Sequence, residues 1–156
     1  MGRVKSLSLV CYDGTIQGSK TISSDAGLIS VHHLHRNDAY NLPDDFHSEY
    51  NSGIYVLVGQ QNRDQLSVYI GEAGNVIKRL DQHTGREWWT SVYIFNKTGG
   101  EINRAMREFL ENKMINDKNI QRFVIENVKK NSNVRLNQAD KINANTLYSE
   151  IVDGCR

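Results

Sequence analysis

Two short apolar segments separated by a polar one form the clearest pattern in the chain. Residues 53–59 (GIYVLVG) and 66–71 (LSVYIG) are rich in β-branched and aromatic residues, which favour strands. The segment between them, QQNRDQ, is polar and suits a turn. The pattern therefore predicts an antiparallel hairpin, and SVYIF at 91–95 predicts a third strand.

Apolar residues at helical spacing predict two helices after the hairpin. The first spans residues 73–83 and has Asn75 as a suitable N-cap. Its apolar positions are Val76, Ile77 and Leu80. The second spans residues 101–115 and has the strongest amphipathic pattern in the chain. Its apolar face consists of Ile102, Ala105, Met106, Phe109, Leu110 and Met114.

The region before the hairpin predicts further strands. Residues 5–12 alternate between polar and apolar and end at an Asp-Gly turn signal, which indicates a strand. Residues 27–34 fit either a strand or a strand–helix junction. Residues 36–53 contain the only proline and are expected to be irregular.

The region after the second helix completes the predicted fold. Residues 121–127 fit either a strand or an extension of that helix. A final helix is expected to start at Asn137, which forms a capping-box pattern with Asp140. Its apolar stripe is Ile142, Leu147 and Ile151. Together the elements predict an α+β fold with a small central antiparallel sheet flanked by helices, an extra N-terminal β segment and a C-terminal helix.

Length and composition fit a single folded domain. Of the 156 residues, 38% are hydrophobic and 24% charged, and we expect a core at 52–127 with extensions at 1–51 and 128–156. No stretch reaches the roughly 18 apolar residues of a membrane span, and the N-terminus lacks the pattern of a signal peptide. Cys11 and Cys155 form no recognisable disulfide or metal pattern, so we expect a cytoplasmic protein.

Charge is balanced overall but unevenly distributed. With 19 basic and 18 acidic residues the net charge is +1, which does not by itself indicate a nucleic-acid-binding protein. Residues 1–50 carry 4 basic and 6 acidic groups, a net charge of −2, whereas residues 73–122 carry 9 and 6, a net charge of +3. A site for a polyanion is therefore expected in the middle of the chain.

Five polar residues in the central region have the chemistry of a catalytic site. Tyr55 and Tyr69 lie on the two hairpin strands and share a face if the register allows. Arg79 and His83 are four residues apart on the predicted helix, so they share a face as well. Glu111 lies on the second helix. Taken singly, each of these residues also fits packing or solvent exposure.

In this order and on these elements, the residues resemble the GIY-YIG nuclease superfamily, which includes homing endonucleases, some restriction enzymes and a domain of an excision-repair nuclease. The matching motifs are Gly53-Ile54-Tyr55, Tyr69-Ile70-Gly71, GEAGNVIKRLDQH at 71–83, and Glu111. SLVCYDGTIQGSKTI near the N-terminus and the Trp88-Trp89 pair are similar to a bacterial subgroup of small GIY-YIG proteins. The spacer between the two motif tyrosines is slightly longer than is usual in the family.

The resemblance implies a metal-dependent endonuclease that hydrolyses DNA and leaves a 5′-phosphate and a 3′-hydroxyl. Tyr55 would act as the general base, provided that its neighbours lower its pKa from about 10. Tyr69 would position the water or the phosphate, and Arg79 would stabilise the phosphoryl transition state. His83, with an ordinary pKa near 6.5, would assist proton transfer or hold the nucleophile.

The resemblance also implies a metal site and substrate contacts. Glu111 would hold one Mg²⁺ or Mn²⁺, and a single carboxylate predicts weak binding of this ion without DNA. Gly71, Lys78 and Asn127 are the expected substrate contacts, although other asparagines near Asn127 are alternatives. DNA is the expected partner, with no membrane and no small-molecule cofactor, and both a monomer and a homodimer fit the sequence.

Three rival interpretations stay open at this point. His32, His33 and His35 could bind zinc, but no cysteine or carboxylate lies at ligand spacing nearby, so polar surface histidines are favoured. A non-catalytic nucleic-acid-binding module could keep the same fold, and a structural or accessory subunit would suit the small size. The intact set of catalytic residue types favours the nuclease over both.

Overall fold

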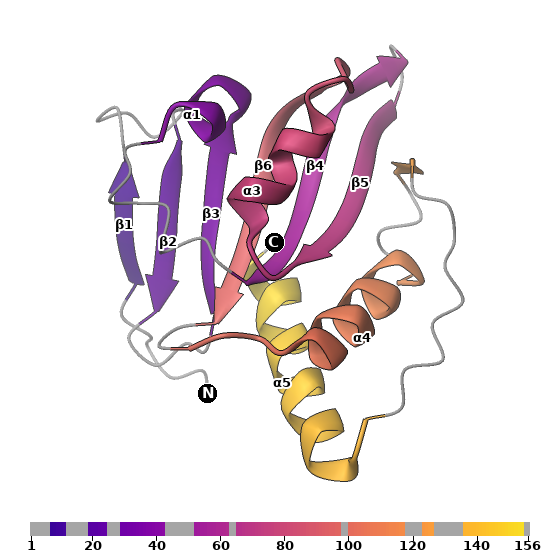
Figure 1. The fold of residues 1–156 in the computed structure, drawn as a ribbon. Coiled ribbons are helices and arrows are strands. Elements are labelled where there is room, and N and C mark those ends of the chain that lie inside the picture. The colour runs from indigo at the N-terminus through magenta and orange to yellow at the C-terminus, as the bar shows by residue number, and fades with distance from the viewer. Residues whose placement is uncertain are drawn as a thin grey trace.

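A seven-stranded sheet forms the centre of the part of the chain that the structure describes (Figure 1). The computed structural model describes residues 7–11, 19–24, 29–42, 52–62, 65–97, 100–117, 123–126 and 136–154. Neighbouring strands are antiparallel, except that β7 is parallel to β5. In sheet order the strands are β1 (Leu7–Cys11), β2 (Lys20–Ser24), β3 (Ile29–His35), β6 (Trp89–Lys97), β4 (Gly53–Asn62), β5 (Gln65–Ala73) and β7 (Val124–Ile125).

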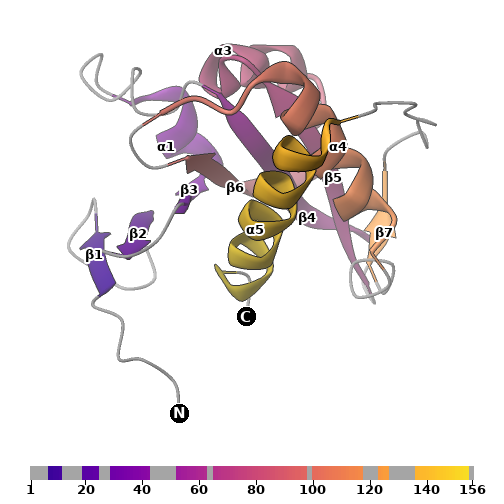
Figure 2. The ribbon, with the colours of Figure 1, turned by 90° about the horizontal axis from the view of Figure 1, so that it is seen from below.

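Helices cover both faces of this sheet (Figures 1 and 2). On one face lie α1 (Arg36–Tyr40) and α3 (Val76–Leu80), and a 3₁₀ turn, Asp81–His83, follows α3. On the other face lie α4 (Arg104–Ile115) and α5 (Gln138–Gly154). The arrangement confirms the predicted α+β fold. Within the described ranges, no helix is long and apolar enough to cross a membrane.

The hairpin contributes to a separate apolar core on each face of the sheet. Ile54 and Ile70 pack with Leu110 of α4, whereas Tyr55 and Leu57 pack in the cluster that includes α3. Because both faces are covered, the strands are apolar on both sides, which explains their nearly continuous apolar sequence. The predicted hairpin is confirmed, although β4 and β5 extend into the segment that was expected to form the turn.

The N-terminal strands extend the central sheet. β3 pairs with β6 from Ile29 opposite Lys97 to His35 opposite Ser91, and β2 and β1 continue outward from β3. Of the two alternatives for residues 27–34, the strand is confirmed for the described residues from Ile29 onward, and α1 begins only after that range. The expectation of an irregular segment from residue 36 onward is therefore wrong for its first five residues, which form α1, while 43–51 lie outside the described residues.

Three helices begin with an asparagine cap. In each, the side-chain oxygen accepts a hydrogen bond from the backbone N–H three residues later, at 3.1, 2.9 and 2.7 Å. The caps are Asn75, Asn103 and Asn137. The first and third confirm the sequence prediction. The second was not predicted, and it explains why α4 begins three residues later than its apolar pattern suggested.

Two predicted apolar contacts are wrong. Ala105 on α4 is exposed, and Ile142 on α5 is 59% exposed. The apolar face expected from the sequence pattern of each helix is therefore wider than the part that is buried. The buried residues are Met106, Leu110, Met114 and Ile115 on α4, and Ala144, Leu147 and Tyr148 on α5.

The three histidines of β3 do not enclose a metal site. His32 is buried, and its Nδ1 lies 2.7 Å from the hydroxyl of Thr21. His33 stacks on Tyr93 with ring centroids 4.5 Å apart, and the rings of His33 and His35 are 5.6 Å apart. Among the described residues, no three His, Cys, Asp or Glu side chains gather as metal ligands. These contacts favour packing roles over the zinc interpretation.

Candidate active site

The two motif tyrosines stand on the same face of the hairpin. In the β4–β5 ladder Tyr55 lies opposite Gly71, and Tyr69 lies opposite Leu57. Residues opposite each other or two apart along a strand share a face, so both tyrosines point to the α3 side of the sheet. Their rings stack with centroids 6.3 Å apart and planes 25° apart. The register therefore provides the shared face that the sequence required.

The ring of Tyr55 lies directly over Gly71. A Cβ atom at Gly71 would collide with Cζ and the hydroxyl of Tyr55. The glycine of the second motif is thus needed so that the tyrosine of the first can cross the neighbouring strand. Direct contact between Gly71 and a substrate stays a prediction.

Gly71→Ala should destabilise the protein by about 1–3 kcal/mol, because the added methyl group overpacks the site and must displace the Tyr55 ring. Gly85→Ala is the matched control, since a Cβ there meets no atom of the described residues within 4 Å. Urea unfolding of the two variants measures the difference in the free energy of unfolding. Equal stabilities would contradict close packing of Tyr55 on Gly71.

His83 is held against both tyrosines by the turn that follows α3. Its Nε2 lies 2.9 Å from the hydroxyl oxygen of Tyr55, and its ring centroid lies 4.9 Å from that of Tyr69. The indole N–H of Trp89 donates to the His83 carbonyl at 3.2 Å, which ties this turn to β6. Tyr55 and His83 are only 1% and 5% exposed, so their hydrogen bond is shielded from water.

The imidazole of His83 is neutral at physiological pH. Burial lowers its pKa to about 4, and the positive charges of Arg86 and Arg79 act in the same direction. The expectation of a His83 pKa near 6.5 was therefore wrong, because burial and the two neighbouring guanidinium groups disfavour the positively charged imidazolium. A neutral Nε2 is free to accept the proton of the Tyr55 hydroxyl.

The phenol of Tyr55 is protonated at physiological pH. Burial raises its pKa well above 10, the charge of Tyr69 adds to this, and Glu111 and Glu72 act in the same direction. Arg79 lowers the pKa but does not offset these causes. The condition for Tyr55 to act as a base, that its neighbours lower its pKa, is therefore not met by the side chains around it, although Arg79 acts in that direction. A base at this position requires a partner that takes up the phenolic proton.

The stability of the protein should fall as the pH is lowered from about 6.5 to about 4. The unfolded His83 has a pKa of about 6.5, whereas the folded pKa is about 4, so in this window the unfolded state binds more protons. His32, whose pKa burial also lowers to about 4, acts in the same direction.

Thermal unfolding at several pH values measures this dependence. His83→Gln, which carries no titrating group, should lose less stability than the wild type between pH 6.5 and pH 5. His32 is present in both proteins, so the difference isolates His83. An identical pH dependence in the two proteins would contradict the lowered pKa of His83.

Arg79 and Glu111 approach this pair from the two sides of the sheet. Arg79 lies on α3, is half-buried and forms no ion pair within the described ranges. Glu111 lies on α4, on the opposite face, and is half-buried. The charges of both act on the pKa of Tyr55. Of the five residues selected from the sequence, the structure thus brings Tyr55, Tyr69 and His83 into direct contact, and that Arg79 and Glu111 join them in one site stays a prediction.

Glu111 is the carboxylate that the sequence resemblance implies as a ligand for a divalent cation. Glu72, the other carboxylate whose charge reaches Tyr55, is already bound by Arg107 at 2.8 Å. Because no group of three ligands forms within the described ranges, the residues present do not enclose an ion. A single carboxylate does fit Mg²⁺, which keeps most of its water ligands.

Two further arginines line the surroundings of the site. The guanidinium carbon of Arg86, an exposed residue, lies 4.6 Å from the ring centroid of Tyr69. Arg36 donates to the carbonyls of Thr84, Arg86 and Trp89 at 2.9, 2.6 and 3.2 Å, so it holds the loop that carries Arg86. The sequence could have indicated Arg86, because it is a basic residue just after the predicted helix. No local pattern links Arg36 to a loop some fifty residues later.

Of the two remaining predicted substrate contacts, only one lies within the described residues. Lys78 is exposed on α3, and Asn127 lies outside the described residues. A hollow of about 510 Å³ lies between α4 and α5, and another of about 380 Å³ lies beside Arg36 and Trp89. Neither is lined by Tyr55, Tyr69 or His83, although the second borders Arg36 and Trp89 beside the His83 turn.

No protein-family model, no curated protein and no solved structure matches this chain. Function is therefore inferred from the motifs of the sequence and from the geometry around Tyr55.

Proposed function

We propose that this protein is a metal-dependent endonuclease of the GIY-YIG type that hydrolyses phosphodiester bonds in DNA. The observation that carries the proposal is the hydrogen bond between Tyr55 and His83. Both rings lie against the ring of Tyr69, and the charges of Arg79 and Glu111 act on the pKa of Tyr55. These groups supply a proton acceptor, a phosphate-binding cation and a metal ligand in one place.

Tyr55 and His83 act together as the base. Water attacks the phosphorus atom, and its proton passes to Oη of Tyr55 while the phenolic proton passes to Nε2 of His83. The new bond joins phosphorus to the water oxygen, the bond from phosphorus to the 3′ oxygen breaks, and the departing 3′ oxygen takes up a proton from solvent to become the 3′-hydroxyl. Before the reaction the phenol of Tyr55 carries its proton and the imidazole of His83 is neutral, which are the starting states of this relay. The raised pKa of Tyr55 and the lowered pKa of His83 both disfavour a separate phenolate and imidazolium, so the two proton transfers occur together with the attack on phosphorus.

Arg79 and Glu111 provide the charge stabilisation. The guanidinium of Arg79 donates to the phosphoryl oxygens as negative charge develops on them. Glu111 holds the Mg²⁺ or Mn²⁺, and a bound ion of this kind supplies further positive charge at the phosphate. Tyr69 orients the phosphate, and the exposed Arg86 and Lys78 bind the flanking backbone of the DNA.

Nicking of supercoiled plasmid tests this proposal. The wild type should convert it to the open-circular form with Mg²⁺ or Mn²⁺ and not with EDTA, and Glu111→Ala should be inactive at every metal concentration. The nicks should carry a 5′-phosphate and a 3′-hydroxyl. Absence of nicking by the wild type on plasmid and on branched duplexes would overturn the proposed activity.

A second candidate is a module that binds nucleic acid without cleaving it. The near-complete burial of Tyr55 favours it, because an attacking water must reach a hydroxyl that is only 1% exposed. Retention of DNA by both the wild type and Glu111→Ala, with no nicking by either, would establish this alternative in place of the nuclease.

A further inference from the structure

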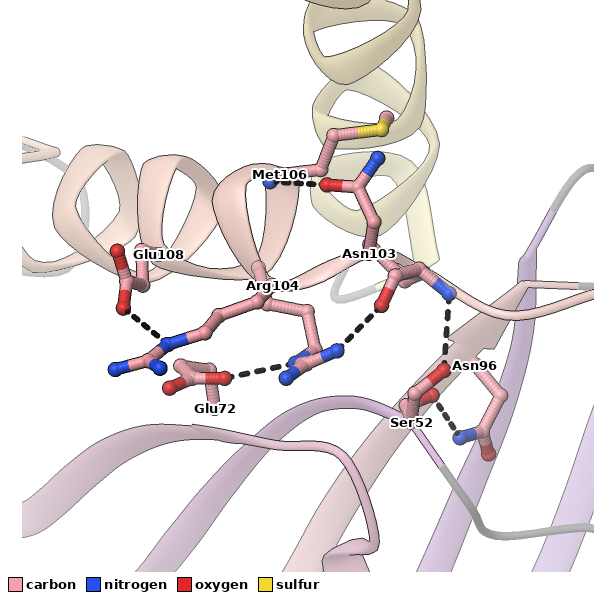
Figure 3. Close-up of polar contacts among 9 residues, drawn as sticks. Ser52, Glu72, Asn96, Asn103, Arg104, Met106 and Glu108 are labelled. Carbon is pink, nitrogen blue, oxygen red and sulfur yellow. Dashed lines mark hydrogen bonds and ion pairs between the residues drawn. The ribbon is translucent and has the colours of Figure 1, made fainter. Parts of the chain in front are cut away.

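The carboxylate directly after the second motif is bound by the helix that carries Glu111. Nε of Arg107, on α4, lies 2.8 Å from a carboxylate oxygen of Glu72 on β5 (Figure 3). Their side chains are 13% and 16% exposed, so the pair is largely removed from solvent. Breaking such a pair by removing one partner leaves a poorly solvated charge, which gives the contact strong control over local geometry.

Arg107 also belongs to a set of contacts at the start of α4. Its Nη1 donates to the carbonyl of Ile102 at 2.7 Å, and the Ile102 N–H donates to the hydroxyl of Ser52 at 2.9 Å. The amide of Asn96 donates to the Ser52 carbonyl at 2.8 Å (Figure 3). The start of α4 is therefore connected to the start of β4, the end of β5 and the end of β6.

These contacts fix the helix that carries Glu111 relative to the end of β5. Glu72 follows Gly71, the residue that the Tyr55 ring covers. Glu111 follows Arg107 by four residues, so it lies on the same face of α4, about 6 Å further along the helix. The ion pair between Arg107 and Glu72 therefore sets how α4 is rotated about its axis, and how far it is shifted along that axis, at Glu111.

We propose that Arg107, bound to Glu72, is the positioning residue that sets where α4 presents the Glu111 carboxylate to a divalent cation. This inference rests on the proposed nuclease function and adds to it the contact that holds the metal ligand in position. Arg107 does not touch the substrate. It acts through Glu111, and it also keeps Glu72 engaged away from the cation.

The helix offers a matched control pair. Nε of Arg104 lies 3.0 Å from Glu108 on the same helix, and these side chains are 81% and 34% exposed (Figure 3). Replacing either arginine by glutamine removes one positive charge from α4. Only the Arg107 change removes a contact between the helix and the sheet.

Arg107→Gln should raise the Mn²⁺ concentration for half-maximal nicking about tenfold or more, which is typical for loss of an outer contact to a metal ligand. Electrostatics alone predicts the opposite sign, because removing a positive charge favours cation binding. Arg104→Gln should leave the Mn²⁺ requirement near that of the wild type. Neither change should alter the affinity for DNA measured without metal by more than a few fold.

A second readout does not depend on activity. Mn²⁺ alone, added to ¹⁵N-labelled protein, should broaden the amide signal of Glu111 in the wild type and in Arg104→Gln. In Arg107→Gln the same broadening should need about tenfold more Mn²⁺. Arg107→Lys keeps a cation for Glu72 and is expected to fold, and it should shift both readouts in the same direction by a smaller factor than the glutamine variant.

The outcomes separate this inference from the proposed function. If the wild type nicks DNA but Arg107→Gln and Arg107→Lys match Arg104→Gln, or need less Mn²⁺, the positioning role is overturned and the nuclease stands. If the wild type neither nicks DNA nor shows Mn²⁺ broadening at Glu111, the proposed function is overturned and the positioning role is overturned with it.

Discussion

Arg79→Ala should lower the rate of plasmid nicking by about a thousandfold at saturating Mg²⁺, the loss typical of removing a preorganised donor to the transition state. Arg79 forms no ion pair within the described ranges, so its removal should leave the stability nearly unchanged. Its positive charge also lowers the pKa of both Tyr55 and His83, and the alanine variant loses these effects as well. Single-turnover nicking assays measure the rate.

Arg104→Ala is the matched control for this change. It also removes a guanidinium from a helix, but Arg104 pairs only with Glu108 on the surface of α4. This variant should nick at close to the wild-type rate. Equal nicking rates for the Arg79 and Arg104 variants would show that Arg79 takes no part in the reaction.

Tyr55→Phe should lower the nicking rate by about 10²–10⁴-fold, the usual contribution of a general base. Phenylalanine keeps the ring that covers Gly71 and stacks on Tyr69, but it lacks the hydroxyl that lies 2.9 Å from His83. The lost hydrogen bond should cost about 1 kcal/mol of stability. DNA affinity, measured by fluorescence anisotropy, should stay close to that of the wild type.

Tyr40→Phe separates the effect on the reaction from the effect on stability. The hydroxyl of Tyr40 donates to the carbonyl of Leu80 at 2.7 Å, so its removal also costs one hydrogen bond near α3. This variant should show a comparable loss of stability and nearly full nicking activity. If both tyrosine variants keep full activity, Tyr55 is not the base.

The hairpin and the helix caps could be predicted because their signals are local. Alternating and β-branched residues define β4 and β5, and an asparagine before an apolar helical pattern marks the caps at Asn75 and Asn137. The same spacing rules placed Arg79 and His83 one turn apart. The structure places His83 on the 3₁₀ turn after α3, still within reach of Tyr55.

Contacts between distant segments could not be predicted in this way. The ion pair of Glu72 with Arg107 spans 35 residues, and the hydrogen bond of Arg36 to Arg86 spans 50. Neither pair has a spacing that distinguishes it from any other acidic and basic residues in the chain. The wrong assignments of Ala105 and Ile142 have a similar origin, since the width of a buried stripe depends on which elements cover the helix.

The sequence by itself determined the elements and which residues could serve a phosphate-cleaving site, because strand and helix periodicity and side-chain chemistry are properties of short segments. Only the tertiary structure decided that the phenol of Tyr55 is protonated and that the imidazole of His83 is neutral. A pKa depends on burial and on charges contributed by β5, α3, α4 and the loop with Arg86, and these segments meet only when the chain is folded.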